Sequence, residues 1–112
     1  MKGTYLGEFE EVVLLTIGIL DGNAYGVSVQ KELADQLGRS VTLSALHTAM
    51  HRMEKKGFLE SKLGDATKER GGKRKRLFYV TGLGREALIA ARSTREKLWQ
   101  AMPALSTQNP EQ

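Results

Sequence analysis

Residues 43–81 read LSALHTAMHRMEKKGFLESKLGDATKERGGKRKRLFYVT, and this stretch decides the fold. Its first part predicts an amphipathic helix that ends at Gly57. The apolar stripe of this helix is expected to face the core and consists of Leu43, Leu46, Met50 and Met53. Residues 58–63 and 76–81 are rich in β-formers, and Gly71-Gly72 lies between them. The stretch therefore predicts a helix followed by a β-hairpin.

The opposite face of the predicted helix is polar. It carries Ser44, His47, Thr48, His51 and Lys55, with Arg52 on its flank. The candidate cations of the hairpin are Arg70, Lys73, Arg74 and Lys75. A helix can enter the major groove of duplex DNA, and a cationic hairpin beside it can contact the flanking phosphates. We therefore predict DNA-binding roles for these ten residues, with Arg70 and Lys73 at the loop tip foremost, because strand residues alternate in direction.

Two more predicted helices precede this stretch. Residues 25–37 keep helical spacing and end before Gly38, a residue suited to the left-handed end of a helix. A short connection then leads to the amphipathic helix, for which Ser40 or Thr42 can act as the N-cap. Two helices joined by a short turn match the helix-turn-helix unit, and the hairpin that follows completes a winged version of it.

The first predicted helix, residues 7–20, is apolar around almost its whole circumference after an acidic first turn that favours the helix dipole. Such a helix must be buried on more than one side. In a chain this small its own core can cover one side only, so we expect a partner subunit to cover the other. The alternative cover is a fourth helix of the same chain, which is predicted between a Thr81 cap and Pro103.

Charge is distributed unevenly along the 112 residues. Residues 1–49 hold three Lys or Arg against six acidic residues, whereas residues 50–97 hold fourteen against six. The sequence pI of about 9.5 meets the criterion for a nucleic-acid-binding candidate. A regional basic patch can steer a polyanion toward one surface. The alternatives for the basic loop are a solvated charge run and a nuclear-address peptide.

Residue content argues against several other classes of protein. The chain has no cysteine, which excludes disulfides and thiol catalysis. No carboxylate pair, nucleophile elbow or Ser-His-Asp order stands out, so neither an enzyme nor a cofactor is expected. The longest apolar stretch, residues 12–20, is too short to span a membrane, and the first residues do not resemble a secretion signal. A soluble cytoplasmic protein is the simplest interpretation.

His47 and His51 stand one helical turn apart, which is also a zinc-binding spacing. With no third ligand nearby in sequence, we expect exposed polar residues and no metal site. Arg52, Ser44 and Thr48 are the candidates for contacts with base edges, because arginine can pair with guanine through two hydrogen bonds and hydroxyls can bond either base type. The structural alternative for Arg52 is packing of its stem against the hairpin.

Four segments resemble the PadR family of bacterial transcriptional regulators, namely residues 6–10, 21–26, 46–57 with its Arg-x-Glu-x-x-Gly ending, and 64–81. The last segment is the most specific, since it combines Glu69-Arg70-Gly71-Gly72 with Arg76 and a Thr-x-x-Gly that opens the next helix. The resemblance covers residues 5–100. It implies a mainly α winged helix-turn-helix with a small β wing, which acts as a homodimer on double-stranded DNA at a palindromic operator and is usually a repressor.

The resemblance also implies that the fourth helix forms the dimer contact together with the first. The residues expected there are Val12, Leu15, Leu88, Ala91, Leu98, Trp99 and Met102. The chain then divides into a DNA-binding domain over residues 5–81, a dimerisation helix over 82–103 and a loose tail over 104–112. The sequence departs from the family in two places, with His47 where relatives usually carry Tyr and Gly82 where many carry Pro.

Trp99 is the only tryptophan in the chain. Packing in the dimer interface is its simplest role, because aromatic side chains commonly anchor interfaces. The alternative follows from the resemblance, since some small relatives sense flat aromatic compounds in a cavity between subunits, and Trp99 would then stack on a small aromatic effector. A winged-helix module that binds proteins and has no DNA role is a further alternative, because a fold does not fix a function.

Overall fold

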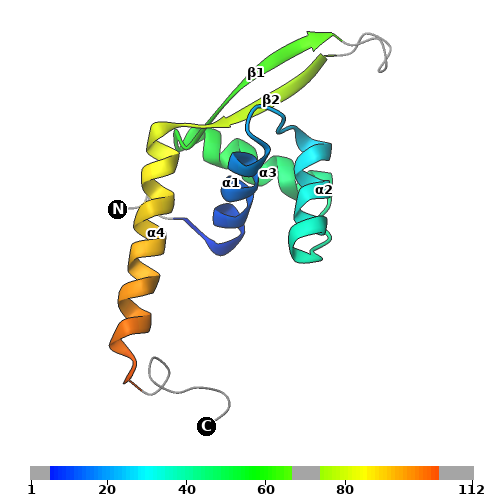
Figure 1. The fold of residues 1–112 in the computed structure, drawn as a ribbon. Helices are drawn as coiled ribbons and strands as arrows, with labels where there is room; N and C mark the ends of the chain where they lie inside the picture. The colour runs from blue at the N-terminus through cyan, green and yellow to red at the C-terminus, as the bar shows by residue number, and fades with distance from the viewer. Residues whose placement is uncertain (1–5, 67–73, 104–112) are drawn as a thin grey trace.

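The computed structural model describes residues 6–66 and 74–103. Within them the chain forms four helices and a two-stranded antiparallel sheet, in the order α1 (Glu8–Leu20), α2 (Gly26–Leu37), α3 (Leu43–Lys55), β1 (Leu59–Ala66), β2 (Arg74–Val80) and α4 (Gly82–Ala101). In Figure 1, α1, α2 and α3 lie together below the hairpin of β1 and β2, while α4 runs down one side. The predicted fold class, mainly α with a small β wing, is confirmed.

One hydrophobic core joins α1, α2 and α3 to the base of the hairpin. Its fully buried large side chains are Val13, Leu14, Ile17, Val29, Leu33, Leu46, Met50, Met53 and Phe58. Phe58 lies between α3 and β1, and burial of a side chain of this kind stabilises a fold by roughly 1.5–3 kcal/mol. The amide of Phe78 adds a hydrogen bond of 2.8 Å to the carbonyl of Ala24, in the turn before α2. The wing is therefore attached to the helices at two points.

Two threonines begin the helices that flank the wing. The Oγ1 atom of Thr42 accepts a hydrogen bond of 3.1 Å from the amide of Ala45, so Thr42 and not Ser40 is the cap of α3. The hydroxyl of Thr81 accepts from the amide of Gly84 at 3.0 Å and donates to the carbonyl of Gly57 at 2.6 Å. The second bond ties the start of α4 to the end of α3.

The strands differ from the sequence-based prediction at their ends. β1 starts at Leu59 and continues to Ala66, beyond the predicted end at residue 63, and β2 starts at Arg74, two residues before the predicted start. The strands pair from Leu59 with Val80 to Ala66 with Arg74, with an irregularity after Leu63. Backbone pairing with the opposite strand decides these bounds, because Gly64 and its neighbours have low intrinsic β propensity.

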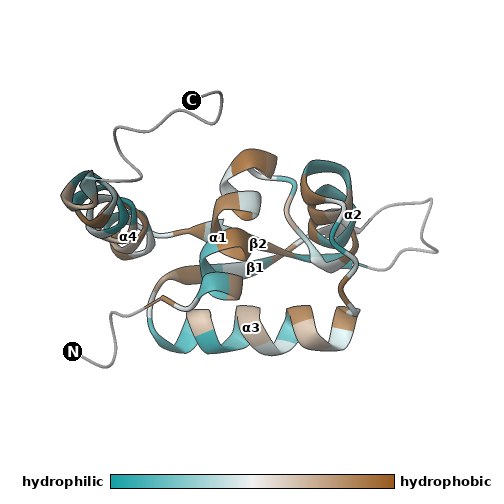
Figure 2. Cartoon of the chain, turned by 90° about the horizontal axis from the view of Figure 1, so that it is seen from below, coloured by the Kyte–Doolittle hydropathy of each residue, from teal (hydrophilic) through white to brown (hydrophobic). Residues whose placement is uncertain are grey.

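The structure corrects the predicted burial of Leu43 and refines the prediction of what covers α1. Leu43 was expected in the core stripe of α3, but it is 37% exposed because it opens the helix beyond the edge of the core, while Ala49 is buried. Figure 2 shows α1 between α2 and α4, with α3 beneath it and α4 standing apart on one side. α4 contacts α1 within the chain yet leaves Leu15 and Ile19 exposed, so it covers only part of that face.

Candidate nucleic-acid interface

The outer face of α3 is open to solvent along its whole length. All six candidate residues of the helix are exposed, namely Ser44, His47, Thr48, His51, Arg52 and Lys55. The opposite side is closed, since Leu46, Met50 and Met53 are fully buried. A helix that is free on one face from its first to its last turn has the shape needed to lie in a major groove.

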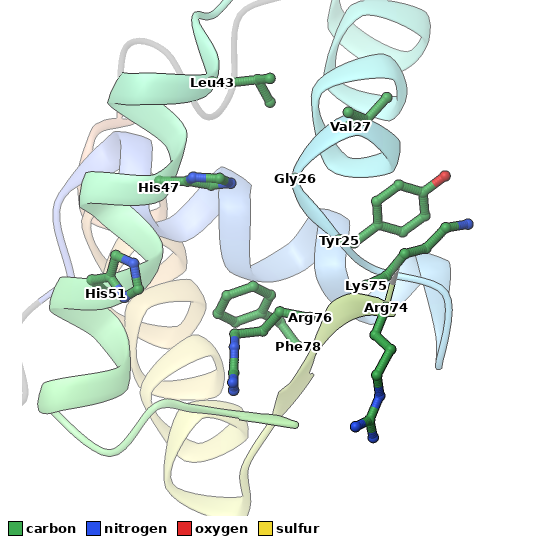
Figure 3. A pocket seen from close by; sticks show the side chains of 10 residues that line it. All are labelled: Tyr25, Gly26, Val27, Leu43, His47, His51, Arg74, Lys75, Arg76 and Phe78. Atoms are coloured by element: carbon green, nitrogen blue, oxygen red, sulfur yellow. The ribbon is translucent and has the colours of Figure 1, made fainter. Parts of the chain in front are cut away.

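A groove of about 300 Å³ separates α3 from β2 and from the start of α2. Figure 3 shows that His47 and His51 point into it from α3, while Arg76 and Phe78 point into it from β2. The groove is lined by Tyr25, Gly26, Val27, Leu43, His47, His51, Arg74, Lys75, Arg76 and Phe78. Basic side chains and an apolar floor meet here, so the groove could receive one phosphate backbone strand.

His47 lies directly on the first residue of α2. A Cβ atom on Gly26 would approach the Nε2 atom of His47 to 2.6 Å, so the imidazole ring would have to move for any other residue at this position. The His51 ring lies edge-on to that of His47, with their centroids 6.4 Å apart. Within residues 6–66 and 74–103, no group of three or more His, Cys, Asp or Glu side chains is placed so that it could hold a metal ion. The two histidines thus help to shape the groove wall between α2 and α3.

Tyr25, to which the sequence assigned no role, forms the far wall of the groove. Its ring lies 4.2 Å from the ammonium of Lys75, and this cation–π contact holds a β2 cation over the start of α2. The two residues are 50 positions apart in the numbering of the chain. The only sequence signal for this contact is an aromatic residue at the start of a helix, and it does not reveal Lys75 as the partner.

Strand geometry places Arg74 and Arg76 on one face of β2 and Lys75 on the other. Arg74 lines the groove, and its Nε atom donates to the carbonyl of Gly64 at 2.7 Å. Arg76, which the sequence did not single out for DNA binding, donates to the hydroxyl of Ser61 at 3.1 Å and points into the groove. Arg70 and Lys73 lie outside the described residues.

Glu10 on α1 meets two cations at the end of α3. Its carboxylate lies 3.1 Å from the ammonium of Lys56 and 3.5 Å from the Nη1 atom of Arg52, and it accepts a hydrogen bond of 3.1 Å from the amide of Gly7. Burial raises the pKa of this carboxyl, but the bonds from Gly7 and Lys56 outweigh burial and hold it below the ordinary value. Arg52 therefore makes its structural contact with α1, rather than with the hairpin as the structural alternative expected.

The other acidic residues of the first turn of α1 also reach distant elements. Glu8 forms two hydrogen bonds of 2.9 and 3.0 Å with the guanidinium of Arg39, and this bond to Arg39 is the main cause that lowers the pKa of Glu8. Glu11 forms an ion pair with Arg95 on α4. The sequence explained these acids by the helix dipole alone, because partners so far away along the chain leave no local pattern.

A second surface, formed by α1 and α4, is apolar and exposed. This surface consists of Leu15 and Ile19 of α1, Ile89, Leu98 and Trp99 of α4, and Met102 directly after α4. Leu98 is 64% exposed and Trp99 is 57% exposed. Two hollows of about 650 and 600 Å³ lie between the helices. Of the residues expected in the dimer contact, Val12 and Leu88 pack partly on the chain's own core, and Ala91 is half-buried.

A helix-turn-helix whose last helix runs into a two-stranded hairpin defines a winged helix-turn-helix protein. The profile of the Transcriptional regulator PadR-like family matches residues 14–90, and the chain belongs to this family. The protein is therefore a transcriptional regulator by family. No curated protein matches the sequence. None of the helices within residues 6–66 and 74–103 combines the length and apolar character needed to cross a membrane.

Solved structures agree with this assignment. A PadR family transcriptional regulator from Eggerthella lenta DSM 2243 shares 26% identity and superposes with a TM-score of 0.67 over 87% of this chain and 82% of the other. A PadR-like transcriptional regulator from Bacillus cereus strain ATCC 14579 has the same fold, with a TM-score of 0.70 at 18% identity over 90% and 93% of the two chains. A PadR-like transcription factor from Bacteroides fragilis gives 0.70 at 18% identity over 83% and 84%.

Proposed function

We propose that this chain is a sequence-specific regulator that binds double-stranded DNA as a homodimer and represses transcription. The observation that carries the proposal is the groove, because the exposed face of α3 and the basic strand β2 border the same concave surface. Sequence-specific recognition of duplex DNA requires a protein element that contacts the base edges and cations that contact the phosphates beside them. A surface that binds only proteins has no such need for a row of cations beside an exposed helix face.

In this proposal α3 enters the major groove and the wing contacts the phosphates that flank it. A twofold dimer would place its two α3 helices in successive major grooves, about 34–36 Å apart, so the operator should be close to palindromic. Arg52, Ser44 and Thr48 are assigned to base edges. The assigned phosphate contacts are His47, His51, Lys55, Arg74 and Lys75, and Arg70 and Lys73 keep their sequence-based assignment.

Selection of bound sequences from random duplexes by the purified protein tests this function. The expected result is an enriched site of two inverted half-sites about 10 base pairs apart from centre to centre, or a multiple of this spacing. If the protein gave no gel shift with random duplex at low salt, that result would contradict DNA binding and favour a protein-interaction module. Binding without enrichment would contradict sequence specificity.

The dimer in this proposal is formed by the exposed surface of α1 and α4, with residues 82–103 as the dimerisation helix. Leu98 and Trp99 on α4 and Leu15 on α1 are exposed large apolar side chains on this surface. Contiguous apolar surface of this kind marks protein contacts in soluble proteins. A second copy fits because a twofold axis pairs the same apolar surface with itself.

Replacement of Leu98 by Glu should convert the dimer to monomer. Each subunit would then bury an unpaired carboxylate, so the dimer dissociation constant should rise at least about 100-fold. Sedimentation equilibrium measures this change. The matched control is Ala90→Glu, which adds the same charge to an exposed position on the side of α4 opposite Trp99 and should leave the dimer intact. Equal behaviour of the two variants would contradict this interface.

A small aromatic effector is a second candidate function of the same surface. The hollow of about 600 Å³ between α1 and α4 has Trp99 at its edge, together with Leu88 and Arg92. A flat apolar compound could stack there, and it would regulate DNA binding only if its affinity differed between the two states of the protein. Quenching of Trp99 fluorescence together with release of DNA is the expected result, and quenching without release would contradict a regulatory role.

A further inference from the structure

The last turns of α3 concentrate positive charge beside its DNA-facing side. Arg52, Lys55 and Lys56 lie within five residues, with Glu54 as the one acidic residue among them. Arg52 follows Thr48 by one helical turn, so both belong to the same outer face. An unrestrained arginine at such a position can reach any nearby phosphate, and phosphate contacts carry no sequence information.

A fixed carboxylate from another element meets this charge. The side chain of Glu10 is only 7% exposed, and its two oxygens lie 3.1 and 3.2 Å from the Lys56 ammonium. The amide of Gly7 also donates to it at 3.1 Å, which anchors it to the backbone at the start of α1. Two partners thus hold the carboxylate in place before Arg52 is considered.

Arg52 touches this carboxylate with one nitrogen only. Its Nη1 atom lies 3.5 Å from Oε2 of Glu10, and its side chain is still 53% exposed. A guanidinium has five N–H donors in a rigid plane, so one contact restricts the group and leaves its other donors available. This arrangement orients the group toward solvent without neutralising its capacity to donate.

From this geometry we infer that Glu10 is a positioning residue for sequence discrimination, which holds the Arg52 guanidinium in the orientation that reads a base edge. The inference rests on the proposed DNA-binding function. Preorganisation matters because a guanidinium that is already oriented loses less rotamer freedom when it pairs with a base. The same contact restrains Arg52 from the many orientations in which it would reach a phosphate. Lys56 and Gly7 support it by fixing the carboxylate.

Glu10→Gln is the central test, since the amide keeps the size of the side chain and its acceptor for Gly7. Affinity for the selected operator should fall relative to random duplex, and the operator-to-random ratio should drop about tenfold. On random duplex the salt slope should steepen by about 0.9 for each additional phosphate that the released Arg52 neutralises. Fluorescence anisotropy titrations at several salt concentrations give both quantities.

Four further variants separate positioning from charge and from stability. Glu86→Gln makes the same charge change on an exposed position of α4 and should leave the ratio unchanged. Arg52→Ala should lower the ratio by itself, and adding Glu10→Gln to it should change the ratio no further. Arg52→Lys keeps the charge but lacks the planar fork, so it should lower the ratio as Glu10→Gln does.

The outcomes distinguish this inference from the function on which it rests. A wild-type protein that binds no duplex or enriches no sequence overturns the proposed function and this inference with it. A wild type that selects an operator, combined with a Glu10→Gln ratio equal to the wild-type ratio, overturns the inference alone. A merely structural Glu10 would reduce binding to operator and random duplex by the same factor, and that result also overturns it.

Discussion

Affinity for duplex DNA should fall by about 10³–10⁵ between 50 and 200 mM salt if the dimer neutralises about 6–10 phosphates. The reason is counterion release, because each cation placed on a phosphate frees a condensed ion from the DNA. In the proposed dimer, the basic side chains of the groove and of α3 would supply such contacts in each subunit, with Lys75, Arg76 and Lys55 among them. Anisotropy titration of labelled random duplex across this salt range measures the slope.

Single-charge variants show whether the slope belongs to this surface. Lys75→Ala should weaken binding to all sequences alike and reduce the slope by about 1 for each phosphate that is no longer neutralised. Its control is Lys97→Ala, which removes the same charge from an exposed position on α4, away from the groove. A slope near zero for the wild type, or equal slopes for both variants, would argue against the groove as the phosphate site.

Gly84→Ala should destabilise the protein by about 2–4 kcal/mol, although alanine is normally the better helix former. The added Cβ would lie 2.3 Å from the carbonyl oxygen of Phe58 and 3.1 Å from its carbonyl carbon. These are backbone atoms and cannot rotate away, so α4 must move off the base of the wing. For a domain of this size the thermal midpoint should fall by roughly 10–20 °C, as circular dichroism would record.

Gly82→Ala is the matched control, two residues earlier in the same helix. A Cβ on Gly82 would meet nothing within 4 Å, so this variant should keep the midpoint or raise it through a gain of up to about 1 kcal/mol. Similar midpoints for both variants would show that α4 does not pack against Phe58 in this way. Because α4 also carries the proposed dimer surface, Gly84→Ala should weaken DNA binding as well.

The element order was predictable because each element has its own local signal. Helical spacing, the Thr42 and Thr81 caps and the Gly38 end predicted the helices and most of their bounds, and the structure confirms them. The exposed face of α3 was predictable for the same reason, since a period of 3.6 residues assigns polar positions to one side. The strand ends were not, because pairing between β1 and β2 outweighs the local propensity there.

The candidate site was only partly predictable. The contacts of Tyr25 with Lys75 and of Gly26 with His47 join residues far apart in the chain, and no local pattern encodes them. The helical pattern also gave a wrong prediction for Leu43. Periodicity gives the side of the helix on which a residue lies but not the point where the core ends. Arg76 was overlooked for a related reason, since the direction of a strand residue depends on the register of the pair.

Sequence alone determined the order of the elements, the polar side of α3 and the concentration of cations in the second half of the chain, because these properties depend on neighbouring residues. Only the tertiary structure decided which cations the acids of α1 meet. Glu10 lies 42 positions from Arg52 and 46 from Lys56, and Glu11 lies 84 from Arg95. Ion pairs act through distance in space, and chain folding sets that distance, so these partners become visible only when the helices have packed.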